Sequence, residues 1–179
     1  MSPDLSNNVP ASNLAKFMPA LRRVQMLVLD VDGVLTDGRL FYGARGEVMK
    51  AFHVRDGHGI KQVAAAGITV AIISGRKSAA VARRARELGI RHVNQGVNDK
   101  LAALARLTKA RSVALEHCAC VGDDTPDAPM LQAAGLAIAV ADAHADALAA
   151  ADLVTSRSGG QGAVREVCDW LLDARRRRT

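Results

Sequence analysis

Aromatic side chains are scarce in this sequence. Phenylalanine, tyrosine and tryptophan make up only 3% of its 179 residues, although hydrophobic residues make up 49%. A surface that stacks nucleic-acid bases needs aromatic platforms, so the sequence disfavours this class of protein. The core must instead be built from Ala, Val, Leu and Ile, and the length suits one well-buried domain.

Cysteines and long apolar runs are also few. Cys118, Cys120 and Cys168 show no metal-type pairing and follow no secretory leader, so we expect reduced thiols in a cytoplasmic protein. Cys118 and Cys120 alternate along a predicted strand, which favours a packing role. No apolar run reaches the length of a membrane-spanning helix, so no membrane partner is predicted.

Acidic residues are fewer than basic ones, so the formal net charge is +6. Four arginines form the run Arg175 to Arg178, so residues 176–179 are predicted to be a solvated basic tail. This distribution gives little support to nucleic-acid binding, although that function is kept as an alternative. It also suits a small substrate with several negative charges, because arginine binds carboxylates and phosphates.

Strand and helix patterns alternate after an N-terminal extension, residues 1–23, whose last ten residues are a predicted helix. They predict an α/β fold, a Rossmann-like three-layer α/β/α arrangement with a parallel sheet, in one domain over residues 24–175. A β-hairpin over residues 39–52 follows the first strand, and a glycine-rich tail over 157–163 is expected to be mobile. The expected strands are 26–29, 68–73, 92–93, 114–121, 136–140 and 153–154, and the expected helices are 56–66, 77–88, 98–107, 128–134, 142–151 and 163–175.

The first strand, residues 26–29, ends at two carboxylates. Side chains on a strand alternate, so Asp30 and Asp32 are expected to lean the same way, while Gly33 permits a sharp turn that aims the carbonyl of Asp32 at the same space. Oxygen ligands of this kind suit a hard cation such as Mg2+. An Asx turn is the alternative, and a calcium loop fits poorly, because Phe41 stands where that loop needs Glu.

Polar residues also mark three later strand or helix ends. Ser74 follows the second buried strand just before a predicted helix, where its hydroxyl and free N–H groups suit a phosphate; a plain N-cap is the alternative. Lys100 opposes the dipole in the first turn of a helix and implies a negative neighbour, unless it simply faces solvent. The segment GDDTPD, residues 122–127, brings three further carboxylates to the edge where parallel sheets bind ligands.

These four signals, in this order, resemble the haloacid dehalogenase superfamily of phosphohydrolases, and the resemblance covers nearly all of the chain from residue 24. It implies that Asp30 is the nucleophile that forms an aspartyl phosphate. It implies that Asp32 protonates the leaving alcohol and later activates water. Ser74 and Lys100 are then expected to hold the phosphoryl oxygens.

The same resemblance implies a magnesium site formed by Asp30, the carbonyl of Asp32, and Asp123. Asp124 and Asp127 are expected to orient these metal ligands without contacting the ion themselves. The alternative for Asp127 is that it helps to start a helix. Superfamily members that act on small substrates usually carry a cap domain. Residues 37–55 and 101–122 leave no room for one, so a capless protein is expected, whose substrate is either macromolecular or enclosed by a neighbouring subunit.

Longer motifs indicate a closer resemblance: KAFHVRDGHGIK (50–61), ISGRKS (73–78), GDDTPDAPM, VADAHADA and SGGQGAVREVCD (158–169). They resemble a family of sugar-acid phosphatases that hydrolyse 3-deoxy-D-manno-octulosonate 8-phosphate in lipopolysaccharide synthesis. This family implies a homotetramer with central hairpins, active sites at subunit interfaces, and a Gly159 to Gly162 segment that reaches the next protomer's site. The substrate contacts that it implies are His53, Val54, Arg55, Asp56, Gly57, Lys61, Arg76, Arg84 and Lys100.

Two positions depart from the family pattern. Lys61 stands where arginine is usual, and His58 where an aromatic or aliphatic residue is usual. Lysine gives a point charge without the planar fork of arginine, which bears on substrate choice rather than on catalysis. A phosphatase of a nine-carbon, sialic-acid-type sugar 9-phosphate is therefore an alternative, and a catalytically silent phosphate-sensing domain is another.

Overall fold

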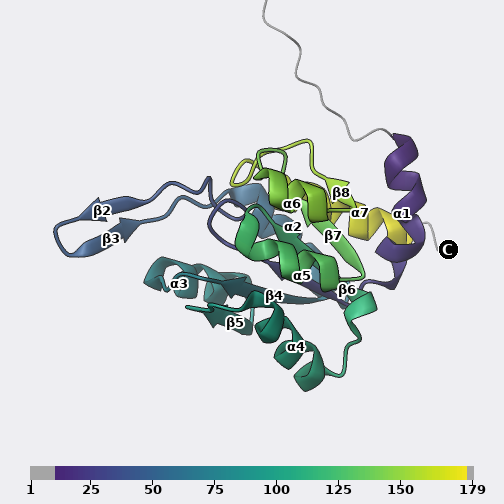
Figure 1. Ribbon diagram of the computed structural model, residues 1–179, viewed down its shortest axis with the longest axis horizontal. Helices are drawn as coiled ribbons and strands as arrows, with labels where there is room; N and C mark the ends of the chain where they lie inside the picture. The colour runs from purple at the N-terminus through teal and green to yellow at the C-terminus, as the bar shows by residue number, and fades with distance from the viewer. Residues whose placement is uncertain (1–10, 177–179) are drawn as a thin grey trace, which may run out of the picture.

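A six-stranded parallel sheet forms the centre of the protein, whose computed structural model describes residues 11–176 (Figure 1). The strands lie in the order β5-β4-β1-β6-β7-β8, and every neighbouring pair is parallel. The α/β fold with a parallel sheet is thus confirmed. Its strands are β1 (Met26–Leu29), β4 (Thr69–Ser74), β5 (His92–Gln95), β6 (Cys118–Gly122), β7 (Leu136–Ala139) and β8 (Leu153–Val154).

Helices cover both faces of the sheet, which confirms the three-layer arrangement. They are α1 (Ala11–Arg23), α2 (Val54–Ala65), α3 (Ala79–Leu88), α4 (Lys100–Arg111), α5 (Ala128–Ala133), α6 (Ala145–Ala150) and α7 (Ala163–Arg176). Successive residues of β1 face opposite layers: Leu27 and Leu29 pack with side chains of α1, α2, α3 and α7, whereas Met26 and Val28 pack with α4, α5 and α6. Residues 1–10 and 177–179, which include most of the predicted basic tail, lie outside the described residues.

One predicted strand and one predicted helix begin several residues later in the structure. The strand expected over 114–121 begins only at Cys118, because β1, its neighbour, begins at Met26, which pairs with Cys118; Leu115–His117 form a 3-10 helix instead. The helix expected over 142–151 begins at Ala145, where the side chain of His144 accepts from the N–H of Asp146.

The predicted hairpin is present as β2 (Phe41–Gly43) and β3 (Gly46–Met49), and it projects away from the sheet (Figure 1). The predicted packing role of Cys118 and Cys120 is also confirmed. Cys118, Cys120 and Cys168 are free and buried, and burial raises the pKa of each thiol. In the part of the chain that is described, no helix combines the length and apolarity needed to cross a bilayer.

Part of the glycine-rich segment packs on the loop that follows β1. Gly160 N donates to the carbonyl of Val34 at 3.0 Å, and a Cβ atom on Gly159 would stand 1.6 Å from the carbonyl oxygen of Gly33. Gly159 and Gly160 therefore lie against their own protomer, and the reach of the segment to the next protomer stays a prediction. Because these two residues have no side chain, the segment packs closely on the loop after β1 of its own protomer.

Candidate active site

Asp30 and Lys100 form a buried ion pair at the carboxyl end of the sheet. Asp30 directly follows β1, and its side chain is 6% exposed; Lys100 is the first residue of α4, and its side chain is 7% exposed. Lys100 Nζ lies 2.8 Å from Asp30 Oδ1 and 2.5 Å from Asp127 Oδ1. These carboxylates are the negative neighbours that the position of Lys100 in its helix implied.

Three carboxylates gather around this lysine. Single oxygens of Asp30, Asp123 and Asp127 lie within 4.8 Å of one another. Asp127 Oδ2 accepts from the backbone N–H groups of Asp123 and Asp124, at 3.0 and 3.2 Å, which fixes the loop after β6. Asp123 Oδ1 is buried and has no hydrogen-bond partner among the described residues. All these ligand atoms are hard oxygens, a donor set that suits a small divalent cation.

Gly33 makes room for this cluster. Its φ angle is +95°, and a Cβ atom there would stand 1.9 Å from Asp123 Oδ2. Only glycine allows both the turn and the approach of the loop after β6.

Electrostatic repulsion in the cluster changes its protonation. Burial, together with the charges of Asp30 and Asp127, raises the pKa of Asp123 to about 8. Burial and the charge of Asp127 also raise the pKa of Asp30 to about 6, although Lys100 opposes this shift. Because the pKa of Asp123 is raised to about 8, this carboxyl group keeps its proton near neutral pH when no cation is bound.

Asp32 does not join this cluster through its side chain. Its Oδ1 accepts from Lys50 Nζ, and its Oδ2 lies 3.9 Å from Arg76 Nε. The side chain of Asp32 therefore has other partners than that of Asp30, and a shared direction of the two carboxylates stays a prediction. Residues 32–35 form a turn rather than a continued strand, so strand alternation does not extend to Asp32.

Ser74 is the last residue of β4, which pairs with β1, so it ends at the same edge of the sheet. The helix that follows does not begin beside it. Ser78 is extended, with φ −145° and ψ 129°, and its Oγ accepts from the N–H of Val81, so α3 begins at Ala79. Both the helix start at residue 77 and the N-cap alternative for Ser74 are therefore wrong. Asp124 is an exposed N-cap and accepts from the N–H of Thr125 at 2.7 Å.

The predicted substrate contacts lie in several places. Lys100 contacts Asp30 and Arg76 lies beside Asp32, whereas residues 53–57 form the start of α2. Asp56 is buried and accepts from the N–H of Arg165 at 2.7 Å, so it anchors α7. A Cβ atom on Gly57 would stand 2.2 Å from Arg84 Nη2, so Gly57 makes space for that guanidinium group.

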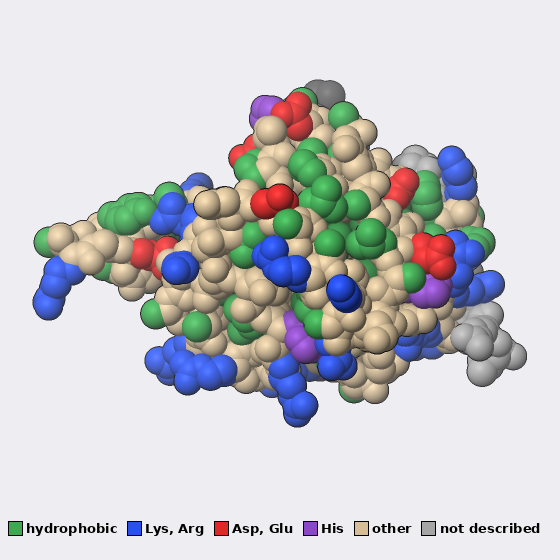
Figure 2. Space-filling view, turned by 60° about the horizontal axis from the view of Figure 1, so that its bottom comes forward, with side chains coloured by type: hydrophobic (Ala, Val, Ile, Leu, Met, Phe, Trp, Pro, Cys, Tyr) green, Lys and Arg blue, Asp and Glu red, His purple; other side chains and the backbone are tan. Residues whose placement is uncertain are grey.

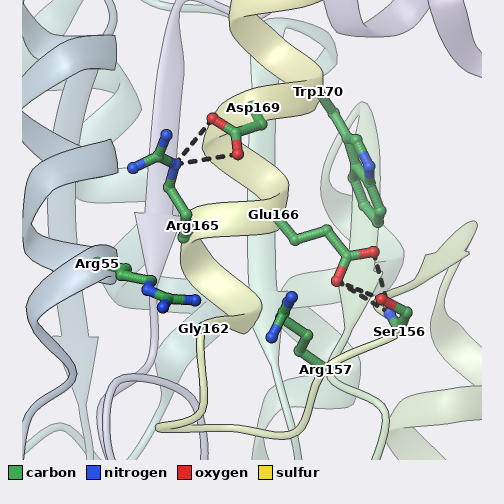
Figure 3. Close-up of a pocket in the computed structure, with 8 residues that line it drawn as sticks. All are labelled: Arg55, Ser156, Arg157, Gly162, Arg165, Glu166, Asp169 and Trp170. Atoms are coloured by element: carbon green, nitrogen blue, oxygen red, sulfur yellow. Dashed lines mark hydrogen bonds and ion pairs between the residues drawn. The ribbon is translucent and has the colours of Figure 1, made fainter.

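The remaining contacts near α2 are more accessible. His53 caps α2 through its side chain, whereas Val54, Arg55 and Lys61 are exposed. Arg55 points into a cavity of about 550 Å³ on the side of α7 (Figure 3). The residues that line this cavity are Arg55, Ser156, Arg157, Gly162, Arg165, Glu166, Asp169 and Trp170, which include none of the three carboxylates around Lys100. Arg55 thus contributes to a cavity that none of these three carboxylates lines.

Sequence reasoning missed two residues near Asp32. Lys50 contacts Asp32 directly, and Glu47 contacts Lys50. Lys50 opens the motif KAFHVRDGHGIK, but nothing in the sequence shows that the hairpin returns to the first strand. A charged residue at the base of a hairpin is ordinarily solvated. Only the burial of Lys50, which the structure shows, distinguishes it from a surface lysine.

Comparisons with known proteins agree with this geometry. The family model described as haloacid dehalogenase-like hydrolase matches residues 90–167. A parallel sheet with a carboxylate after its first strand, a buried lysine and an acidic loop after a later strand is the arrangement expected for this class. The chain belongs to the haloacid dehalogenase-like hydrolases, as the sequence motifs predicted.

The relatives identify the family within this class. The 3-deoxy-D-manno-octulosonate 8-phosphate phosphatase of Escherichia coli (strain B / BL21-DE3) is 49% identical over 158 residues, which cover 88% of this chain and 84% of the relative. The enzyme of the same name from Yersinia pestis is 47% identical over 149 residues, 83% of this chain and 80% of the relative. The chain therefore belongs to the family of 3-deoxy-D-manno-octulosonate 8-phosphate phosphatases.

Solved structures give the same result. The Moraxella catarrhalis phosphatase of this name, in complex with a magnesium ion, a phosphate ion and a KDO molecule, superposes with a TM-score of 0.88 at 44% identity and covers 90% of this chain and 92% of that one. The cobalt-bound phosphatase of Haemophilus influenzae superposes with a TM-score of 0.85 at 46% identity, over 87% and 91% of the two chains.

Proposed function

We propose that this protein hydrolyses 3-deoxy-D-manno-octulosonate 8-phosphate to the free sugar acid and phosphate, a step of lipopolysaccharide synthesis in the cytoplasm. The observation that carries the proposal is the buried contact of Asp30 with Lys100 beside Asp123 and Asp127. It supplies a nucleophilic carboxylate, a cation for phosphoryl oxygens, and further oxygen ligands at one sheet edge. The identity of the substrate is inferred from the family to which the chain belongs.

Magnesium is the cofactor that we propose for this site. The buried Asp123 Oδ1 without a hydrogen-bond partner and the raised pKa values of Asp30 and Asp123 both favour a cation among these oxygens. Asp30, the carbonyl of Asp32, and Asp123 would hold the ion, and Asp127 would orient the loop that carries Asp123. When bound, Mg2+ would reduce the repulsion between carboxylates and the phosphate dianion.

The residues of the chain would then carry out two displacements. An oxygen of Asp30 attacks phosphorus, the bond from phosphorus to the sugar oxygen breaks, and Asp32 donates a proton to that oxygen. Asp32 then takes a proton from water, whose oxygen attacks the aspartyl phosphate and releases Asp30 and inorganic phosphate. Lys100 and Ser74 would bind the phosphoryl oxygens during both displacements.

A panel of sugar phosphates tests the substrate. Phosphate release should be measured with the eight-carbon sugar-acid 8-phosphate, a nine-carbon sugar-acid 9-phosphate and a hexose phosphate, each with and without Mg2+. We expect the highest kcat/KM for the eight-carbon acid and no turnover in a chelator. A higher kcat/KM for the nine-carbon acid would overturn the substrate assignment, whereas no turnover of any ester would overturn the phosphatase proposal.

The stability of the metal-free protein is expected to fall as pH rises from about 4 to about 8. An unfolded aspartate ionises near pH 4, whereas folded Asp123 and Asp30 keep their protons until about pH 8 and about 6. The folded state therefore binds more protons over this range, and the stability that these groups contribute below pH 4 is lost as pH rises through their folded pKa values. Melting temperatures in a chelator should show this fall.

The Asp123→Asn variant is the control for this pH dependence. It removes the carboxyl group with the larger shift, so its melting temperature in a chelator should change less with pH. Because Mg2+ binds ionised carboxylates, its stabilisation of the natural protein should grow with pH. Parallel curves for the two proteins in a chelator would contradict the assigned protonation.

We also propose that the protein is a homotetramer with active sites at subunit interfaces. Support comes from the hairpin, where apolar side chains are exposed along a segment that projects from the sheet (Figure 2). These side chains are Leu40, Phe41, Tyr42, Val48 and Met49, which are 38–63% exposed. A surface of this kind is more typical of an interface than of a monomer. Arg55 is exposed and lines a cavity that Asp30 does not line, which agrees with a role in a neighbour's site.

Replacing Val48 with Glu is expected to dissociate the tetramer. Val48 is 63% exposed in one protomer, and a carboxylate there would be desolvated when hairpins pack together. Light scattering after gel filtration should show a smaller species with lower turnover. Leu148→Glu, at a position on α6 that is 37% exposed, is the matched control and should stay assembled. An unchanged mass for Val48→Glu would count against central hairpins.

A further inference from the structure

Lys50 is the most deeply buried charged group at the base of the hairpin. It follows β3, and its side chain is only 1% exposed. Its Nζ donates to Asp32 Oδ1 and lies 3.2 Å from Glu47 Oε2. An ammonium group that is removed from water in this way needs such partners, so its place is set by these two carboxylates.

Glu47 is in turn fixed from the body of the protein. Its Oε1 accepts from Ser78 Oγ, and Ser78 caps α3. Glu47 therefore joins the hairpin to the start of α3, and it contacts the same Lys50 Nζ that donates to Asp32. The chain of contacts runs from Ser78 through Glu47 and Lys50 to Asp32.

Arg76 approaches the other oxygen of Asp32. Its Nη2 donates to the hydroxyl of Tyr42 on the hairpin at 2.5 Å, and its Nε lies 3.9 Å from Asp32 Oδ2 without a hydrogen-bond partner among the described residues. Only Oδ1 of Asp32 is therefore engaged in a hydrogen bond with Lys50, and Oδ2 is left to exchange a proton.

We propose that Lys50 is a positioning residue for Asp32, and that Glu47 holds Lys50 in place for this task. The inference rests on the proposed function, in which Asp32 protonates the leaving oxygen. The contact at Oδ1 would fix the rotation of the carboxyl group, so that Oδ2 is presented to the leaving oxygen. The hairpin would thus serve catalysis within its own protomer, in addition to any contact with a neighbour.

Two substrates with different leaving groups test this role. A sugar alkoxide needs a proton to leave, whereas p-nitrophenolate leaves without one. The first displacement, which kcat/KM reports, therefore depends on a well-placed Asp32 only for the sugar phosphate. For Lys50→Met we expect kcat/KM to fall by about 100-fold for the sugar phosphate and by less than about threefold for p-nitrophenyl phosphate. Asp32→Asn should show the same pattern, and Lys50→Arg should restore part of the loss.

Further variants separate positioning from folding. Glu47→Gln should change the ratio of the two kcat/KM values in the same direction, and it carries the test if Lys50→Met does not fold. Lys109→Met, at an exposed position on α4, should leave both values unchanged. Equal losses for both substrates, or no loss, would overturn the role of Lys50. If the natural protein hydrolysed neither ester, the proposed function would fail first, and this role with it.

Discussion

Replacement of Asp30 with Asn is expected to lower turnover of the sugar phosphate at least about a thousandfold, because the amide cannot form the bond to phosphorus. The fold should tolerate the change. Burial and the charge of Asp127 raise the pKa of Asp30 to about 6, so the charged form is disfavoured in the metal-free protein. A neutral side chain of the same shape, which still accepts from Lys100, should therefore leave the melting temperature equal or higher.

Steady-state phosphate release and thermal denaturation measure these two effects. Asp173→Asn is the matched control, because Asp173 is an exposed partner of Arg176 near the end of α7. It should retain full turnover. Residual turnover of more than about one per cent in Asp30→Asn, beyond what deamidation explains, would contradict a nucleophilic role.

Replacement of Lys100 with Met is expected to affect both turnover and stability. Lys100 contacts Asp30 at 2.8 Å and Asp127 at 2.5 Å, and all three side chains are at most 7% exposed. Removal of one partner from a buried ion pair leaves uncompensated charge, which costs about 3–5 kcal/mol. Loss of a cation at the phosphoryl group lowers kcat by about 100- to 1000-fold. Urea denaturation in a chelator and steady-state kinetics measure the two losses.

A double variant distinguishes these causes. In Lys100→Met with Asp127→Asn, one of the two uncompensated carboxylates is removed, so part of the lost stability should return. Turnover should not return, because the cation is still absent. If Lys100→Met were as stable as the natural protein in a chelator, the lysine would not be compensating Asp30 and Asp127 as the structure indicates.

The positions that we propose as catalytic or metal-binding could be placed at one sheet edge because each one ends or follows an element that the sequence defines by itself. Asp30 ends an apolar run, Ser74 ends another, and Asp123 ends a third. In a parallel sheet, the carboxyl ends of the strands lie at one edge, irrespective of the sequence between the strands. The helix bounds near Ser74 were less predictable, because either Ser74 or Ser78 satisfies the preference for a capping residue, and only Ser78 has its Oγ on a helix N–H.

The sequence by itself determined the alternation of strands and helices, the order of the polar strand ends, and therefore the class of chemistry. Only the tertiary structure decided that Lys50 reaches Asp32, that Asp56 anchors α7, and that Gly159 lies on Gly33. The physical reason is the separation along the sequence over which each interaction acts. Hydrophobic periodicity and capping act over a few neighbouring residues, whereas these contacts join segments whose meeting depends on the packing of the whole chain.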